Sequence, residues 1–109
     1  MIFKKIELTK AAIIYGNLNL SQIIDFFPKD SIGAPNKKDG LGKLVTLIYT
    51  DGKQLRTIET DIYSDKKIFR SRLGSNGTKA MIHHLNARSG DEILIEKLDH
   101  YVYKVSKIY

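Results

Sequence analysis

The chain has 109 residues, enough to bury its own core, so residues 1–109 are predicted to form a single domain. It contains no cysteine, which excludes a disulfide framework and cysteine-ligated zinc and fits a reducing, cytoplasmic location. No apolar run reaches membrane-spanning length, so no membrane partner is expected. The net charge of +6 and the pI near 9.5 favour a polyanionic partner, nucleic acid first, although solubilising lysines would give the same balance.

The first apolar segments predict extended structure. Residues 3–8 alternate between apolar and charged side chains, which is typical of a strand. The apolar residues 11–15 are expected to continue that strand or to pair with it, until Gly16 breaks the pattern.

A short helix over residues 19–27 is predicted next, with Asn19 or Ser21 as its cap. Pro28 ends this helix because proline disfavours helical geometry at the residue before it. The chain then passes through a basic, glycine-dotted segment, residues 28–43. Loops of this length inside a compact domain are uncommon and are usually functional or disordered.

Three strands follow the long loop. Residues 43–49 are apolar on both faces, which predicts a central strand. Asp51 and Gly52 suit a type I′ hairpin turn, so residues 54–63 form the return strand. A further strand is expected over residues 66–73.

The last third of the chain predicts a helix and a hairpin. The helix covers residues 78–87, and the hairpin joins residues 92–98 to residues 101–109 across Asp99 and His100. Many short strands with closely spaced turns indicate a barrel or sandwich, with the helices plugging its openings.

No catalytic histidine or nucleophile is predicted. His83 and His84 are adjacent on a helix, so they point in different directions and cannot form a metal pair of i, i+4 spacing. The chain has no glycine-rich phosphate loop at the start of a helix and no serine elbow.

The carboxylates also do not predict a nuclease. Glu92 and Glu96 share one strand face, while Lys97 lies on the other. Glu59 and Asp61 are expected on one face of their strand, but no lysine follows at the required spacing. A metal-dependent nuclease needs carboxylates that converge on a divalent ion beside a lysine. We therefore expect no metal, no cofactor and no enzymatic activity.

Positive charge is concentrated in two segments. Residues 29–43 contain four lysines and two aspartates, a net charge of +2. Residues 61–72 contain two lysines and two arginines against two aspartates, again +2. Together they carry +4 of the net +6, and such clustering indicates nucleic-acid binding more strongly than evenly spread charge.

Two arginines in the second segment allow alternative interpretations. Arg70 and Arg72 are expected on one face of a strand, roughly 6.6 Å apart, which would let both read base edges in a major groove. Alternatively, they pair with Glu59 or Asp61 across the hairpin as ordinary ion pairs. The spacing alone is compatible with both.

The second half of the chain resembles a known family. "TDIYSDKKIFRSRLG" (residues 60–74), a helix and "SGDEILIEKLDHYVYKV" (residues 89–105) are similar to DNA-binding pseudobarrels, and "FFPKDSIG" (residues 26–33) fits the start of the same pattern. This family includes the N-terminal effector domain of EcoRII-type restriction endonucleases, the recognition domains of related bacterial restriction enzymes and the plant "B-three" domains. The resemblance begins at about Asn17. Plant members carry Gly-Trp after the arginine strand, whereas this chain has no tryptophan, which favours the bacterial branch.

The resemblance implies a mainly β fold with two short helices, a seven-stranded open DNA-binding pseudobarrel. It implies that two arms, residues 28–43 and 60–72, grip duplex DNA in the major groove, with Phe26 and Phe27 anchoring the first arm. The DNA-contacting residues implied by the two arms are Lys29, Ser31, Asn36, Lys37, Lys38, Lys43, Asp61, Tyr63, Ser64, Lys66, Lys67, Arg70 and Arg72.

The function implied is sequence-specific recognition of double-stranded DNA without catalysis, as the target-recognition or effector domain of a restriction-modification system. A fused or associated nuclease or motor subunit would be the protein partner. One alternative is a small barrel that binds RNA or single-stranded nucleic acid, with Tyr63, Tyr101 and Tyr103 as stacking platforms. Another is a protein-interaction module whose positive charge is incidental.

Overall fold

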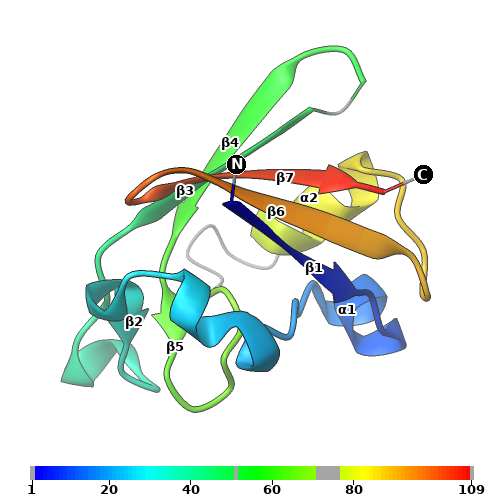
Figure 1. The fold of residues 1–109 in the computed structure, drawn as a ribbon. Helices are drawn as coiled ribbons and strands as arrows, with labels where there is room; N and C mark the ends of the chain where they lie inside the picture. The colour runs from blue at the N-terminus through cyan, green and yellow to red at the C-terminus, as the bar shows by residue number, and fades with distance from the viewer. Residues whose placement is uncertain (1, 51, 71–76, 109) are drawn as a thin grey trace.

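The computed structural model describes residues 2–50, 52–70 and 77–108, and within them the fold is mainly β. These ranges contain seven strands: β1 (Ile2–Glu7), β2 (Ile32–Gly33), β3 (Val45–Thr50), β4 (Leu55–Thr60), β5 (Ile62–Tyr63), β6 (Glu92–Asp99) and β7 (Val102–Lys107). Five of them form a mixed sheet of order β1-β6-β7-β3-β4, and β2 and β5 form a separate parallel pair (Figure 1). These two sheets do not close into a barrel, so the predicted fold class, mainly β with seven strands in an open arrangement, is confirmed.

The pairing of the five-stranded sheet follows from its hairpins. β3 and β4 are antiparallel, as are β6 and β7, whose register shifts between Lys97 and Asp99. β3 pairs in parallel with β7, which places it inside the sheet, as its two apolar faces predicted. Among the described residues, β1 pairs with β6 alone and forms one edge of the sheet, and β4 forms the other.

The helices are short. They are α1 (Lys10–Tyr15), α2 (Gly77–His84) and three 3-10 segments, η1 (Ser21–Phe26), η2 (Lys29–Ser31) and η3 (Lys37–Asp39). The prediction that residues 11–15 are extended is wrong, because the ends of this segment favour a helix. Thr9 Oγ1 accepts a hydrogen bond from the amide of Ala12 at 3.2 Å, and Gly16, with φ of 75°, ends the helix in the left-handed conformation.

The core is one cluster of apolar side chains from both α-helices, η1 and the strands. The most deeply buried members include Leu18, Leu20, Val45, Leu47, Ile62, Met81, Ile93, Ile95 and Tyr103. Thr78 Oγ1 donates to the carbonyl of Gly16 at 2.8 Å and ties α2 to the end of α1. In the part of the chain that the structure describes, no helix has the length and apolar character to cross a membrane.

The chain leaves the five-stranded sheet at Asp61. The expected return strand over residues 54–63 is therefore split, because β4 ends at Thr60 and β5 starts at Ile62. The expected strand over residues 66–73 is also wrong within the described residues, where residues 64–66 form a turn and only a single bridge joins Ile62 to Phe69. Residues 71–73 and the predicted turn residue Asp51 lie outside the described residues.

Candidate nucleic-acid interface

Two loops lie beside each other where β2 and β5 pair (Figure 1). We call residues 28–43 the first arm, residues 60–70 the second arm, and their combined exterior the two-arm surface. Figure 1 shows this surface at the end of the molecule opposite the turn between β3 and β4. Because β2 and β5 are parallel and joined in register, the two arms form one continuous structure.

Both arms start from one aromatic cluster. Phe27 packs edge to face against Phe69 at 5.6 Å between ring centroids, and it lies 4.8 Å from the ring of Tyr103. Phe26 lies 5.6 Å from the same tyrosine ring, whose hydroxyl donates to the Phe26 carbonyl at 2.9 Å. Burial raises the pKa of Tyr103 to about 12, so this hydroxyl remains a donor at neutral pH. The two phenylalanines thus anchor the base of the first arm, as the resemblance implied, and Phe69 anchors the second.

The first arm is a loop closed by its own hydrogen bonds. The amide of Ala34 donates to the carbonyl of Gly40 at 2.9 Å, which brings its two limbs together. Asn36 caps η3 at the tip, because its Oδ1 accepts from the amide of Asp39 at 3.0 Å and its Nδ2 donates to the Asp39 carboxylate at 2.8 Å. This reciprocal pair occupies the amide of Asn36 within the arm.

The second arm is a tight turn held by its own backbone. The amide of Tyr63 donates to the carbonyl of Ile68, and the amide of Lys67 donates to the carbonyl of Tyr63, each at 3.0 Å. Lys67 has a φ of 53°, a left-handed conformation that a non-glycine residue rarely adopts. The amide of Arg70 then donates to the carbonyl of Asp61 at 2.8 Å and closes the turn at its base.

Three of the residues predicted to contact DNA are buried. Arg70 and Asp61 form an ion pair, with Arg70 Nε 2.8 Å from Asp61 Oδ1 and both side chains no more than 1% exposed. The ion-pair alternative that the sequence left open is therefore present for Arg70. Ser31 is fully buried too, and its Oγ has no hydrogen-bond partner within the described residues. None of these three side chains lies on the two-arm surface.

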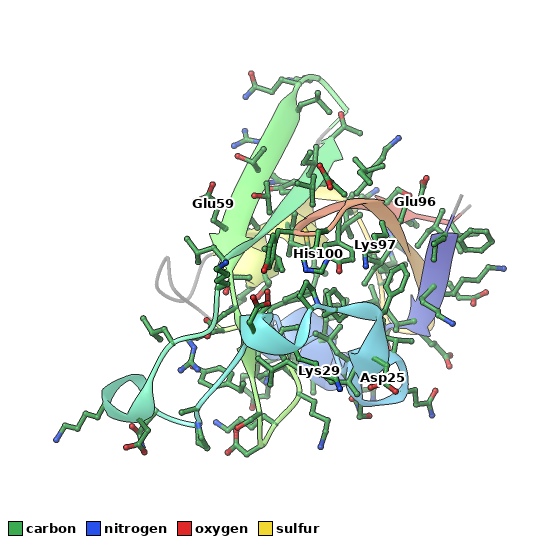
Figure 2. All side chains as sticks on the ribbon, turned by 60° about the vertical axis from the view of Figure 1, so that its left-hand side comes forward. Asp25, Lys29, Glu59, Glu96, Lys97 and His100 are labelled. Carbon is green, nitrogen blue, oxygen red and sulfur yellow. The ribbon has the colours of Figure 1, made fainter. Side chains whose placement is uncertain are left out.

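Most other predicted contact residues lie on the surface. Those that are exposed are Lys29, Asn36, Lys38, Lys43, Ser64 and Lys66, while Tyr63 and Lys67 are half-buried. The side chain of Lys37 and the whole of Arg72 lie outside what the structure describes. Figure 2 shows Lys29 on the helical segments at the base of the first arm, below the β6–β7 turn that carries His100. The arms therefore present lysines, while their one described arginine is directed inward.

A contact that the sequence did not reveal joins the first arm to the β6–β7 turn. The hydroxyl of Tyr101 donates to Asp30 Oδ2 at 2.6 Å, and this hydrogen bond raises the pKa of Tyr101 above its usual value. Lys43 Nζ lies 4.0 Å from the same carboxylate oxygen and 5.3 Å from the centroid of the Tyr101 ring. The amide of Lys43 also donates to the carbonyl of Asp30 at 2.7 Å. These three residues fix the returning limb of the first arm beside the sheet.

The tyrosines do not form an open stacking platform. Tyr103 is in the core. The Tyr63 ring has the Arg70 guanidinium 4.2 Å from its centroid and Lys66 Nζ at 5.5 Å, and Lys43 lies over Tyr101. Cations already occupy positions over both rings, so these contacts do not favour the single-strand alternative.

Acidic and histidine side chains do not converge. Glu59 is exposed on β4 (Figure 2), whereas Asp61 is buried, so the prediction that they share a face is wrong. The prediction fails because the strand ends at Thr60, and the irregular backbone at Asp61 interrupts the alternation of side chains. His84 contacts Tyr49, with 3.2 Å between Nδ1 and the hydroxyl, while His83 is exposed. Across residues 2–50, 52–70 and 77–108, no group of three or more such side chains could hold a metal ion.

The comparisons with known proteins give one structural likeness. No family model matches the chain, and no curated protein matches it in sequence. Its fold is similar to the N-terminal domain of Helicobacter pylori LlaJI.R1, with a TM-score of 0.60 and 8% sequence identity over 100% of this chain and 88% of that chain. At this identity the likeness concerns the fold alone.

Proposed function

We propose that this chain recognises double-stranded DNA in a sequence-specific manner through the two-arm surface, and that it does so without catalysing a reaction. The observation that carries the proposal is the joining of two lysine-bearing arms into one structure by β2 and β5. Charge that clusters on adjacent loops attracts a polyanion more strongly than the same charge spread over the molecule.

The chemistry of the exposed side chains suits contact with the DNA backbone. Lys29, Lys38 and Lys66 are exposed lysines, and each would act as a point charge toward phosphate. Ser64 has an exposed polar side chain of the kind that can meet base edges, whereas the amide of Asn36 is occupied by Asp39. We assign sequence readout to such polar groups, and to Arg72, rather than to Arg70.

A restriction system is the setting that we propose. The motifs of residues 26–33, 60–74 and 89–105 resemble bacterial restriction enzymes, and the similar solved structure is the N-terminal domain of Helicobacter pylori LlaJI.R1. By this analogy, the chain would supply target recognition to a nuclease or motor partner. The absence of converging carboxylates within the described residues is compatible with a binding role.

Binding to matched probes tests the proposal. The full chain should bind a randomised duplex pool more tightly than single-stranded DNA or RNA of the same length at equal salt. Repeated selection from that pool should enrich a defined sequence. Log affinity should fall with log salt by about 0.9 for each phosphate that is neutralised. Equal affinity for all three probes, or a selection without enrichment, would contradict sequence-specific duplex recognition.

A further inference from the structure

The buried Asp61–Arg70 ion pair lies at the boundary between the two arms, and both of its residues belong to the second arm. Each carboxylate oxygen has a different partner, because Oδ1 accepts from Arg70 Nε and Oδ2 accepts from the amide of Gly42, each at 2.8 Å. At the other end of the pair, Arg70 Nη2 donates to the carbonyl of Ala34. The pair therefore contacts both limbs of the first arm, one at Ala34 and one at Gly42.

The contact between the arms is close as well as polar. The amide of Ser64 donates to the carbonyl of Gly33 at 3.0 Å, directly beside the ion pair. A Cβ atom on Gly33 would lie 2.5 Å from Asp61 Oδ2 and from the Gly42 nitrogen, and 3.0 Å from Arg70 Nη2. A side chain at residue 33 would therefore meet both the ion pair of the second arm and the returning limb of its own arm, so only a glycine fits here without a shift.

A buried ion pair contributes little net stability, because desolvation of the two charges offsets most of their attraction. Its well-attested use is to select one arrangement among similar ones, since the pair is satisfied in only one geometry. Here that geometry specifies where the loop between Ala34 and Gly42, which carries Lys38, stands relative to the second arm.

We propose that Asp61 and Arg70 are positioning residues that hold the two arms in one fixed arrangement, so that the two-arm surface meets its ligand already ordered. That this ligand is duplex DNA rests on the proposed function. An ordered surface binds more tightly because the cost of fixing the loops is met during folding rather than during association. Arg70 thus acts on DNA through the arms, without touching it.

The test replaces the pair with apolar side chains of similar size. The Asp61→Leu/Arg70→Met variant should keep a melting temperature close to that of the wild type, because it leaves no unpaired buried charge. The backbone amides of residues 34–42 and of Ser64 should exchange with solvent faster than in the wild type. Affinity for a duplex pool with a randomised centre should fall about tenfold, since the arms must be ordered on binding.

A second ion pair serves as the matched control. Lys107 Nζ lies 3.4 Å from Asp91 Oδ2, where β6 begins and β7 ends. An Asp91→Leu/Lys107→Met variant also removes one cation and one anion, so both double variants keep the net charge of +6. The control should leave amide exchange in the arms and duplex affinity unchanged.

Several results would overturn the proposal. Wild-type exchange of the residue 34–42 amides in the Asp61→Leu/Arg70→Met variant would show that the pair does not position the arms. Faster exchange with unchanged affinity would show that positioning does not matter for binding. If the wild type bound no duplex, the proposed function would fail, while the exchange data would still decide whether the pair holds the arms.

A single conservative variant covers the case in which the double variant does not fold. Arg70→Lys keeps a cation beside Asp61 but loses the planar fork that reaches Ala34. The amides of Ala34 and Ser64 should then exchange faster while the rest of the sheet keeps wild-type protection. Unchanged exchange at both amides in Arg70→Lys would overturn the proposal in the same way.

Discussion

The five-stranded sheet and the two arms are stabilised by different interactions. In the sheet, alternate apolar side chains such as Val45, Leu47 and Ile95 are completely buried, so burial of apolar area holds the strands together. Where the arms meet, the buried side chains include the charged pair Asp61 and Arg70, and the contacts are hydrogen bonds to backbone groups. Apolar contacts are tolerant of direction, whereas polar contacts require one geometry. The sheet therefore supplies stability, and the arms supply a defined surface.

Of the changes considered, removal of one member of the Asp61–Arg70 ion pair should lower the stability of the protein most. Arg70→Ala leaves the carboxylate of Asp61 buried without its cation, at a cost of about 3–5 kcal/mol in the free energy of unfolding. Arg70→Ala should lose much more stability than Asp61→Leu/Arg70→Met, although the double variant removes more polar atoms. Urea denaturation of the wild type, the single variant and the double variant measures these differences in stability. Equal stability of the single and double variants would show that the pair is not buried as described.

A smaller loss of stability is expected where the two limbs of the first arm approach each other closely. A Cβ atom on Gly42 would lie 2.5 Å from the carbonyl oxygen of Ser31, so Gly42→Ala must displace the returning limb of the first arm. The expected cost is about 1–3 kcal/mol, as for other overpacked sites. Thermal unfolding gives the stability, and amide exchange locates the change. A stabilised Gly42→Ala protein would mean that the contact between the two limbs of the first arm is looser than this geometry indicates.

The aromatic cluster below the arms should give a still smaller, pH-dependent effect. Tyr103→Phe removes the hydrogen bond to the Phe26 carbonyl and should cost about 1 kcal/mol at neutral pH. The pKa of Tyr103 is raised from 10.0 to about 12 by burial, so the neutral form is favoured in the folded protein. The contribution of neutral Tyr103 to stability is complete below pH 10 and is lost as the pH rises from 10 to 12.

The alkaline part of that prediction has its own measurement. The free energy of unfolding of the wild type should fall more steeply between pH 10 and pH 12 than that of Tyr103→Phe. Parallel curves over this range would mean that the tyrosine ionises equally easily in the folded and unfolded chains. Duplex affinity at neutral pH should be nearly unchanged, because the hydroxyl lies in the core.

The sheet was largely predictable from the sequence, because alternating apolar residues and short apolar runs both indicate strands, although none of the residues of β1 is buried. The strands β1, β3, β6 and β7 were expected within a few residues of their observed bounds. α1 was not, since its apolar residues have no helical period. Its start and end depend on Thr9 and Gly16, whose capping geometry becomes clear only in the structure.

The arms were predictable as segments but not in their interior. Charge clustering singled out both segments, and Phe26 and Phe27 were expected at the base of the first arm, whereas the contact of Phe69 with Phe27 was not. Strand alternation predicted Phe69 and Arg70 on opposite faces, yet both are buried. Arg70 turns inward because its partners include Ala34, which is 36 positions away in the chain, and spacing within one segment carries no information about such a contact.

The most direct test of duplex binding by the two-arm surface compares two triple variants across a salt series. Lys29→Gln/Lys38→Gln/Lys66→Gln removes exposed lysines of the arms, and Lys4→Gln/Lys5→Gln/Lys10→Gln removes exposed lysines of β1 and α1. Each lowers the net charge from +6 to +3, because three lysines are lost. The arm variant should reduce the slope of log affinity against log salt by up to about 2.7, at about 0.9 for each phosphate contact, while the control keeps nearly the wild-type slope. Equal losses in the two variants would contradict the account, because they would show that binding depends on total charge rather than on the arms.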